Sequence, residues 1–376
     1  MTTVAVCGGG IGGLATAIAL RKFGLDVTVY EQTRQFARVG ADINLTPNAV
    51  RALDGLGIGP AIRESAARPQ FRISRTWDTG AETSRLPMGD SAEQQYGAPQ
   101  LTMHRGDLMT ALENRLPSGV VEMGRRVSGV ADGRIEFTDG STVSADVIVG
   151  ADGIHSAVRT SLLGREQPTF TGVVAFRAVV PTERVGTLPN LDCFTKWWGP
   201  NPSTQIVTFP LNQGKDIFVF ATCGQEEWTE ESWTTPGSVT ELRELYRDFH
   251  PEARALLDAC DDVLKSALYV RDPLASWTDG RSVLLGDAAH PMMPFMAQGA
   301  GMAIEDAVVL SRCLSLFDDP AVALQTYQET RLQRTSRIQR GSRSNEWLKV
   351  AGNGDWVYEY DAWQVPLELA AARTDA

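Results

Sequence analysis

Residues 3–24 read TVAVCGGGIGGLATAIALRKFG, and the fold of the N-terminal region can be predicted from this stretch. The β-branched run at residues 3–7 is typical of a buried parallel strand, and residues 14–23 place apolar side chains at helical spacing. Residues 26–30 predict a second strand, which ends at Glu31, 23 residues after Gly8. This order of strand, glycine-rich turn, helix and strand predicts the start of a doubly wound α/β domain.

The glycines of the turn have the spacing G-x-G-x-x-G, through Gly8, Gly10 and Gly13. Such a turn lets the backbone approach a pyrophosphate, which the free N–H groups of the following helix then bind. An acidic residue after the second strand accepts hydrogen bonds from a ribose hydroxyl. A purely structural turn is the alternative, but the flanking strands argue against it. The predicted dinucleotide-binding residues are Gly8, Gly10, Ile11, Gly12, Gly13 and Glu31.

The chain has 376 residues, enough for two domains, and a net charge of −11. This charge argues against nucleic acid or an anionic membrane as a partner. Its five cysteines are widely spaced, which is typical of reduced thiols, and no cluster predicts a metal site. The sequence has no run of 18 apolar residues and no charged leader, so we expect a soluble cytoplasmic protein.

Two further motifs follow predicted strands. Gly150-Ala151-Asp152-Gly153 follows the run at residues 145–149, and Gly286-Asp287 follows the run at residues 282–285. Because doubly wound folds bind ligands at the carboxyl ends of strands, Asp152 and Asp287 are candidate ligand-binding residues. The alternative for Asp287 is an N-cap that is satisfied locally. A predicted helix whose N–H groups can bind an electron-rich oxygen begins with Gly299, Ala300, Gly301 and Met302.

In this order, the three motifs resemble the fingerprints of class A flavoprotein aromatic hydroxylases, the p-hydroxybenzoate and salicylate hydroxylase family. The resemblance covers nearly the whole chain. It implies a Rossmann-like FAD-binding domain of the glutathione-reductase type, an inserted antiparallel β-sheet substrate domain and C-terminal helices. It also implies FAD, with NADH or NADPH as reductant, and hydroxylation of a small aromatic or heteroaromatic substrate by O2 through a flavin C4a-hydroperoxide. We expect a monomer or a homodimer.

The composition is consistent with two domains, because alternating, tryptophan-containing segments between residues 168 and 270 predict an antiparallel sheet. We place the FAD-binding domain at residues 1–70, 100–165 and 271–350. The substrate domain then comprises residues 71–99 and 166–270. Residues 351–376 form a C-terminal tail in this division.

The resemblance also implies roles around FAD. It places Glu31 at the adenosine ribose and Arg105 near the pyrophosphate and ribityl chain. Asp287 would hydrogen-bond the ribityl chain, and Asp152 would position both FAD and NAD(P)H. Arg38, in the polar loop after Glu31, belongs to the predicted cofactor site. The residues implied to border the isoalloxazine are Pro291, Gly299, Ala300, Gly301 and Met302.

A narrower resemblance, carried by Lys196-Trp197-Trp198 and residues 290–299, is to the 6-hydroxynicotinate 3-monooxygenase subgroup. The positions at which this chain departs from that subgroup are Asn44, Phe194, Ser203, Val207 and Phe295. Because these side chains are less basic or less polar, they predict a substrate that is bulkier or less polar than a hydroxypyridine carboxylate.

A strand predicted at residues 203–209 adds Gln205 and Phe209 to the expected substrate pocket. Arg177 is the candidate for binding a substrate carboxylate, because a guanidinium donates two parallel hydrogen bonds. The alternative for the aromatic residues is ordinary sheet packing. The alternative for Arg177 is an ion pair on the sheet surface.

His290 and Pro291 are the predicted catalytic residues. His290 could act as a base toward a ring hydroxyl, but a hydrogen-bonded structural role beside the flavin is the favoured interpretation. Without such a base, the ring itself would have to be electron-rich, as an aminoarene is. The alternatives to hydroxylation are a flavin-dependent oxidase or dehydrogenase that acts on a cyclic substrate without oxygen insertion, and a non-enzymatic FAD-binding sensor.

Overall fold

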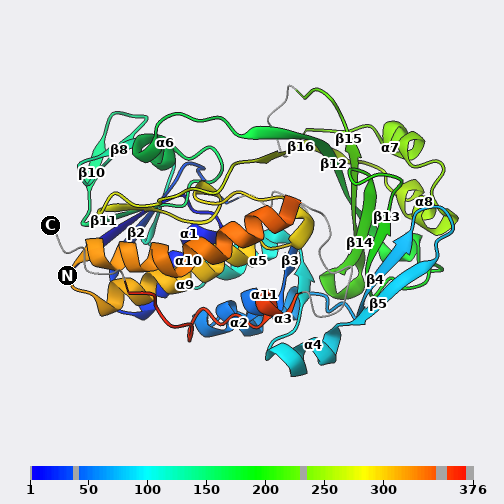
Figure 1. Ribbon diagram of the computed structural model, residues 1–376, viewed down its shortest axis with the longest axis horizontal. Coiled ribbons are helices and arrows are strands. Elements are labelled where there is room, and N and C mark those ends of the chain that lie inside the picture. Colours follow the sequence, from blue (N-terminus) through cyan, green and yellow to red (C-terminus); the bar gives the residue numbers. More distant parts are fainter. Residues whose placement is uncertain (1, 37–41, 229–234, 344–353, 370–376) are drawn as a thin grey trace.

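The computed structural model describes residues 2–36, 42–228, 235–343 and 354–369, which form two regions lying side by side (Figure 1). The first region contains a five-stranded parallel sheet of order β17-β11-β1-β2-β7. Its strands are β1 (Thr3–Cys7), β2 (Asp26–Glu31), β7 (Val121–Met123), β11 (Val147–Gly150) and β17 (Ser282–Leu284). Because these strands pair in parallel, the three motifs that follow β1, β11 and β17 lie at one edge of the sheet.

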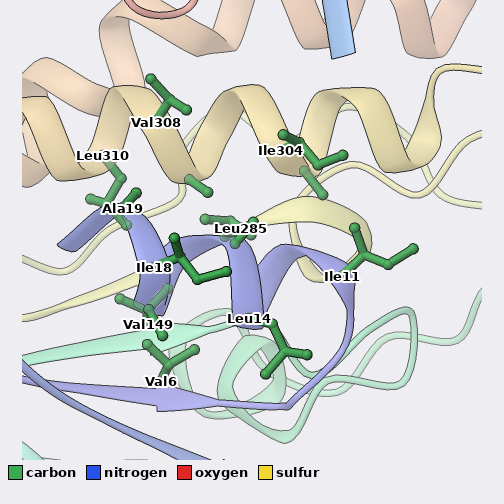
Figure 2. Packing of buried hydrophobic residues seen from close by; sticks show 14 of the residues in the cluster. Val6, Ile11, Leu14, Ile18, Ala19, Val149, Leu285, Ile304, Val308 and Leu310 are labelled. Atoms are coloured by element: carbon green, nitrogen blue, oxygen red, sulfur yellow. The ribbon is translucent and has the colours of Figure 1, made fainter. Parts of the chain in front are cut away.

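One face of this sheet is covered by α1 (Ile11–Lys22), with α9 (Gly299–Leu316) and α10 (Pro320–Arg343) outside it. Figure 2 shows Leu14 and Ile18 of α1 above Val6 and Val149 of the sheet, with α9 on the other side of α1. Helix α1 is therefore buried on both sides. Its nearly continuous apolar sequence follows from this position.

The other face of the parallel sheet is covered by a small antiparallel sheet of order β10-β9-β8. Its strands are β8 (Val127–Ala131), β9 (Arg134–Phe137) and β10 (Thr142–Ser144). The rings of Tyr30 and Phe137 pack across this interface with centroids 5.1 Å apart. The parallel sheet thus lies between two layers, and only its strand ends remain available for ligands.

The second region is a seven-stranded sheet of order β16-β12-β15-β14-β13-β4-β5. Helices α7 (Val239–Leu245) and α8 (Pro251–Asp258) pack on one of its faces. Five of its six neighbouring strand pairs are antiparallel, as predicted, but β4 and β13 pair in parallel. The strands are β4 (Phe71–Thr76), β5 (Glu82–Pro87), β12 (Thr169–Pro181), β13 (Phe194–Trp198), β14 (Gln205–Leu211), β15 (Asp216–Gly224) and β16 (Leu264–Val270).

Shorter elements connect the two regions. The helices are α2 (Pro47–Leu56), α3 (Gly59–Ser65), α4 (Gly89–Tyr96), α5 (Arg105–Glu113), α6 (Ala157–Leu163) and α11 (Asp355–Tyr358). Strands β3 (Ile43–Leu45) and β6 (Leu101–Met103) form a two-stranded sheet. The 3₁₀ turns are η1 (Thr182–Arg184), η2 (Asn212–Gly214), η3 (Gly286–Ala288) and η4 (Pro294–Met296).

The predicted fold class is confirmed, with a Rossmann-like parallel sheet, a separate largely antiparallel sheet and C-terminal helices. The exact domain boundaries stay a prediction. Residues 78–99 contain the polar edge strand β5 and helix α4. In the described part of the chain, no helix is long and apolar enough to cross a membrane.

Candidate active site

The three glycine motifs meet at the edge of the parallel sheet. Gly8 has a φ of +106°, and a Cβ atom there would lie 2.5 Å from the carbonyl oxygen of Ala151 in the second motif. A Cβ on Gly13 would lie 1.9 Å from the carbonyl oxygen of Gly8, and one on Gly12 would lie 2.7 Å from Leu285 beside the third motif. Gly8 and Gly13 are therefore required for close packing against the backbone, as their spacing indicates.

A cavity of about 380 Å³ lies between this edge and the seven-stranded sheet. Helices α1 and α9 both begin at its wall, and neither has a side-chain N-cap. The predicted cofactor residues that line it are Gly10, Ile11, Gly12, Arg105, Asp287, Gly299 and Ala300. Two helix N-termini with uncapped N–H groups suit the phosphates and the electron-rich ring of FAD, so the residues present fit this cofactor.

Glu31 lies beside the first motif and is largely buried. Its carboxylate accepts hydrogen bonds from the N–H groups of Gly9 (2.7 Å) and Thr33 (2.8 Å). These bonds fix the acid against the glycine turn, where a ribose is expected. Arg38 lies outside the described residues.

Asp287 is the carboxylate at the tip of the third motif. Its side chain is accessible from the cavity, and one of its oxygens would lie 4.0 Å from a Cβ placed on Gly299. Loss of hydration raises the pKa of Asp287, and the charges of His290 and Arg105 oppose this increase. Asp287 is therefore not a satisfied N-cap, because no described helix N–H group bonds to it.

Asp152 does not line the cavity. Its carboxylate accepts hydrogen bonds from the Ser156 hydroxyl and from the N–H groups of Ala157 (2.7 Å) and Val158 (3.2 Å), at the start of α6. This arrangement makes it a helix cap in the structure, and its expected contact with FAD or NAD(P)H stays a prediction. Arg159 holds α6 against the third motif by donating to the carbonyl oxygens of Ala288 and Ala289.

The glycines and the methionine that do not line the cavity have structural positions. Gly8 and Gly13 shape the first turn, as described above. A Cβ on Gly301 would lie 3.3 Å from the Gln298 side chain, and Met302 is fully buried beside Arg331. We expect these four residues to shape the cofactor site without touching the cofactor.

The other wall of the cavity is one face of the seven-stranded sheet. Phe194 and Phe209 stack with centroids 5.3 Å apart, and Phe209 contacts Phe218 at 5.0 Å. The predicted pocket residues that line the cavity are Asn44, Arg177, Phe194, Gln205, Val207, Phe209 and Phe295. The structure thus brings seven of the eight predicted residues together in the cavity, five from this sheet, Asn44 from β3 and Phe295 from η4.

Ser203 is the exception. The predicted strand at residues 203–209 begins only at Gln205, and Ser203 lies in the preceding turn. The Asn201 side chain accepts hydrogen bonds from the Ser203 N–H (3.0 Å) and the Thr204 hydroxyl (3.0 Å), which prolongs the turn to that point. The hydroxyl of Ser203 is therefore not part of the cavity lining.

Two buried cations also lie in this wall. Arg72 of β4 is 6% exposed, and its guanidinium lies 4.7 Å from the ring centroid of Phe194. Lys196 of β13 is 3% exposed, with its ammonium group 3.6 Å from the Trp198 ring and 5.9 Å from the Phe295 ring. The cavity therefore carries more positive charge than we expected from the less basic residues at which this chain departs from the 6-hydroxynicotinate 3-monooxygenase subgroup.

Arg72 also lacks a described partner of opposite charge. No carboxylate among the described residues forms an ion pair or hydrogen bond with its guanidinium. Loss of hydration lowers the pKa of Arg72, an effect only partly opposed by Tyr358. A buried cation without an anionic partner is unfavourable, which makes Arg72 a candidate for binding an anionic ligand.

Arg177 points into the same cavity from β12 and donates a hydrogen bond to the Ser266 hydroxyl. Burial lowers the pKa of its guanidinium, and the negative charge of Asp42 opposes this decrease. Arg177 therefore lies on the inner face of the sheet, and the alternative of a surface ion pair does not apply.

The predicted catalytic residues His290 and Pro291 do not line the cavity. His290 is 1% exposed, and its Nε2 lies 2.6 Å from the Asp306 carboxylate. Asp306 also accepts from the Gly286 N–H (3.1 Å) and from Arg331 (2.8 Å). His290 is therefore not placed to take a proton from a substrate, and the prediction of a catalytic base is wrong in this structure.

His290 instead belongs to a buried polar network that supports the third motif. Glu305 accepts hydrogen bonds from Asn48 (2.7 Å) and Arg334 (2.8 Å) and pairs with Arg331 (2.7 Å). The network connects η3 to α2, α9 and α10. It fixes the orientation of the Asp287 loop relative to the α9 N-terminus.

Comparison with known proteins agrees with this architecture. The FAD binding domain family matches residues 1–342. The chain is 40% identical to 6-hydroxynicotinate 3-monooxygenase of Bordetella bronchiseptica, over 97% of this chain and 96% of that protein. It is 38% identical to a 3-amino-4-hydroxybenzoate 2-monooxygenase of Streptomyces platensis, over 90% and 86%.

A solved salicylate hydroxylase substrate complex superimposes with a TM-score of 0.82 and 27% identity, covering 96% of each chain. Sequence and structure thus agree over almost the full length. The chain belongs to the class A flavoprotein hydroxylase family, whose members share this FAD binding domain.

Proposed function

We propose that this protein is an FAD-dependent monooxygenase that uses NADH or NADPH and O2 to hydroxylate a small aromatic or heteroaromatic ring carrying an anionic group. One observation carries the proposal. The cavity joins the two uncapped helix N-termini of the FAD-binding side to an aromatic wall that contains Arg72, Lys196 and Arg177. Family membership supports the chemistry, and this wall supports the substrate class.

The residues of the FAD-binding side would hold the cofactor in the following way. Gly10–Gly12 and the α1 N-terminus would bind the pyrophosphate, Glu31 the ribose and Asp287 the ribityl chain. The α9 N-terminus would stabilise negative charge on the ring system. Bound FAD supplies the activated oxygen, and the protein orients the ring and excludes water.

The sheet side would hold the substrate. Phe194, Phe209 and Val207 offer an apolar surface for a planar ring. Arg72 would bind a carboxylate or another anionic substituent, since its charge lacks a described counter-charge. This proposal replaces the expectation of a less polar substrate, because that expectation did not include Arg72 and Lys196.

The test is a turnover assay with the purified FAD-loaded protein. Consumption of NADH, of NADPH and of O2 is measured with a panel that includes 6-hydroxynicotinate, 3-amino-4-hydroxybenzoate and the corresponding compounds without a carboxylate. A product heavier by one oxygen atom supports hydroxylation. Loss of two hydrogens without oxygen gain would instead show an oxidase or dehydrogenase, and flavin that is never reduced in the presence of any compound would contradict the proposal.

A further inference from the structure

Asp42 is a carboxylate in the cavity wall that none of the roles above includes. It lies immediately before β3, in the lining of the cavity, and it is half-buried. Two cations act on it through their charge: Arg177 of β12 and Arg105 of α5. Asp42 therefore lies in the electric field of both walls of the cavity.

Few groups in this cavity can accept a proton. Within the described part of the chain, its lining contains no histidine, cysteine, tyrosine or glutamate. The carboxylates of Asp42 and Asp287 are the remaining candidates. A base that ionises a ring hydroxyl must face the ring, so the positions of these two aspartates decide between them.

Asp287 belongs to the cofactor side. The charges that act on it are those of His290 and Arg105, which both come from the FAD-binding region. Arg105 also acts on Asp42, but the larger charge influence on Asp42 is that of Arg177. The neighbours of Arg177 across the sheet are Phe220 of β15 and, one strand further, Val207 of β14. Of the two carboxylates, Asp42 is thus the one on the substrate side.

We propose that Asp42 is the catalytic base that takes the proton from a ring hydroxyl of the substrate, an inference that rests on the proposed function. The O–H bond of the ring breaks, the proton passes to an oxygen of Asp42, and the electron pair stays on the ring oxygen. The ring becomes richer in electrons, which the insertion of an electrophilic oxygen requires. After product release, Asp42 returns the proton to solvent.

The surrounding charges suit this transfer. A negative charge moves from Asp42 to the ring oxygen, so Arg177 can stabilise it both before and after the step. Loss of hydration raises the pKa of Asp42 to about 6, while Arg177 and Arg105 limit the increase. The other charged groups lining the cavity are Arg72, Lys196 and Asp287. Asp42 is accordingly ionised at neutral pH but is a stronger base than an exposed aspartate.

The first experiment replaces Asp42 by asparagine, which keeps the shape and removes the proton acceptor. The pH dependence of kcat/KM is measured with 3-amino-4-hydroxybenzoate and with 6-hydroxynicotinate. The native protein should gain activity as the pH rises through about 6. Asp42→Asn should lose this limb and about 10²- to 10⁴-fold of the plateau rate, the usual contribution of a general base.

The matched control is Asp26→Asn, the same chemical change at an exposed position at the start of β2. It should leave the profile unchanged. FAD content is measured for both variants, because equal loss of FAD and activity in Asp42→Asn would show that Asp42 serves the cofactor, and would overturn the proposal. A retained acidic limb with a retained plateau rate would also overturn it.

A second variant tests the idea with Asp42 intact. Arg177 lowers the pKa of Asp42, so Arg177→Met should move the acidic limb to higher pH. A limb that stays in place or moves to lower pH would contradict the role of Asp42. This readout is independent of whether Asp42→Asn folds.

A binding measurement separates this inference from the proposed function. The absorbance of bound 3-amino-4-hydroxybenzoate is titrated with pH in the absence of NAD(P)H and O2, so no turnover is needed. Because an ionised Asp42 opposes a second negative charge beside it, ionisation of the bound ring should occur at higher pH in the native protein than in Asp42→Asn. Identical titrations of the two proteins would refute the role of Asp42 as a base. A shifted titration together with a turnover assay that shows no oxygen insertion would refute only the proposed reaction.

Discussion

Replacement of Arg72 by methionine should weaken binding of an anionic substrate strongly while leaving the fold intact. Arg72 is buried beside the Phe194 ring and has no described carboxylate partner, so a substrate anion would provide its counter-charge. A hydrogen bond to a charged group contributes about 1.5–3 kcal/mol. The expected increase in KM or Kd is therefore about tenfold to a little over a hundredfold.

The assay compares two ligands that differ only in the carboxylate, 3-amino-4-hydroxybenzoate and 2-aminophenol. The affinity of the variant should fall for the first ligand and stay within about twofold for the second, because only the first has an anion for Arg72 to bind. Arg72→Lys keeps the charge but loses the paired donors, so its effect should be intermediate. FAD content serves as the control for the cofactor site.

Thermal unfolding of the ligand-free protein provides a second readout. An unpaired buried cation is unfavourable, so Arg72→Met should leave the melting temperature unchanged or raise it. Equal weakening of both ligands would show that Arg72 supports the pocket shape only. An unchanged Kd for the carboxylate would refute the anionic anchor altogether.

Three further outcomes follow from the structure. Glu31→Ala should fold but retain FAD about ten- to a hundredfold less tightly, since a charged hydrogen bond is lost; apoprotein titrated with FAD checks this, and native affinity would exclude the ribose role. Asp306→Asn should cost about 3–5 kcal/mol in urea unfolding, because Arg331 loses a buried partner, and a change below 1 kcal/mol would contradict the network. Burial would raise the pKa of Asp306, but the charges of His290 and Arg331 outweigh this effect, so the pKa is lowered. The contribution of ionised Asp306 to stability is therefore present above about pH 4 and should be lost as the pH falls further. Equal acid sensitivity of the native protein and of Asp306→Asn would argue against this contribution.

The cofactor side could be predicted well from the sequence because its signals are local. The glycine spacing and the strand ends are read within a few residues, and Gly8 and Gly13 lie where backbone contacts exclude a side chain. Glu31 likewise follows directly from the end of its strand. The resemblance to flavoprotein hydroxylases then joined three local motifs into one site.

The substrate side depends on long-range pairing that the sequence does not display. Arg72 enters the cavity because β4 pairs in parallel with β13, more than a hundred residues later in the chain. Lys196 belongs to a motif of the resemblance, but the face of the sheet on which its side chain lies depends on the same strand pairing. Asp42 belongs to no local motif, and only the tertiary structure places it near Arg177.

His290 shows the opposite error, in which a local motif suggested too much. A histidine next to a cofactor motif is a reasonable candidate for a base. In the structure, however, the Nε2 of His290 is hydrogen-bonded to Asp306, which lies on a different element, α9. The hydrogen bond to this carboxylate gives His290 a structural role in place of the predicted catalytic one. Burial of both partners in one network is information that spacing alone does not contain.

The charge of the cavity connects these observations. Among the described residues, its lining contains four cationic side chains and two carboxylates, although the whole chain carries a net charge of −11. This separation of charge is unfavourable in a ligand-free protein, since the cations are partly removed from water. The phosphates of a dinucleotide near Arg105 and an anionic ring near Arg72 would both reduce it. The excess positive charge therefore favours the binding of two anionic ligands in the cavity. With Arg105 and Arg72 facing these ligands, the positive charge of Arg177 compensates the negative charge of Asp42.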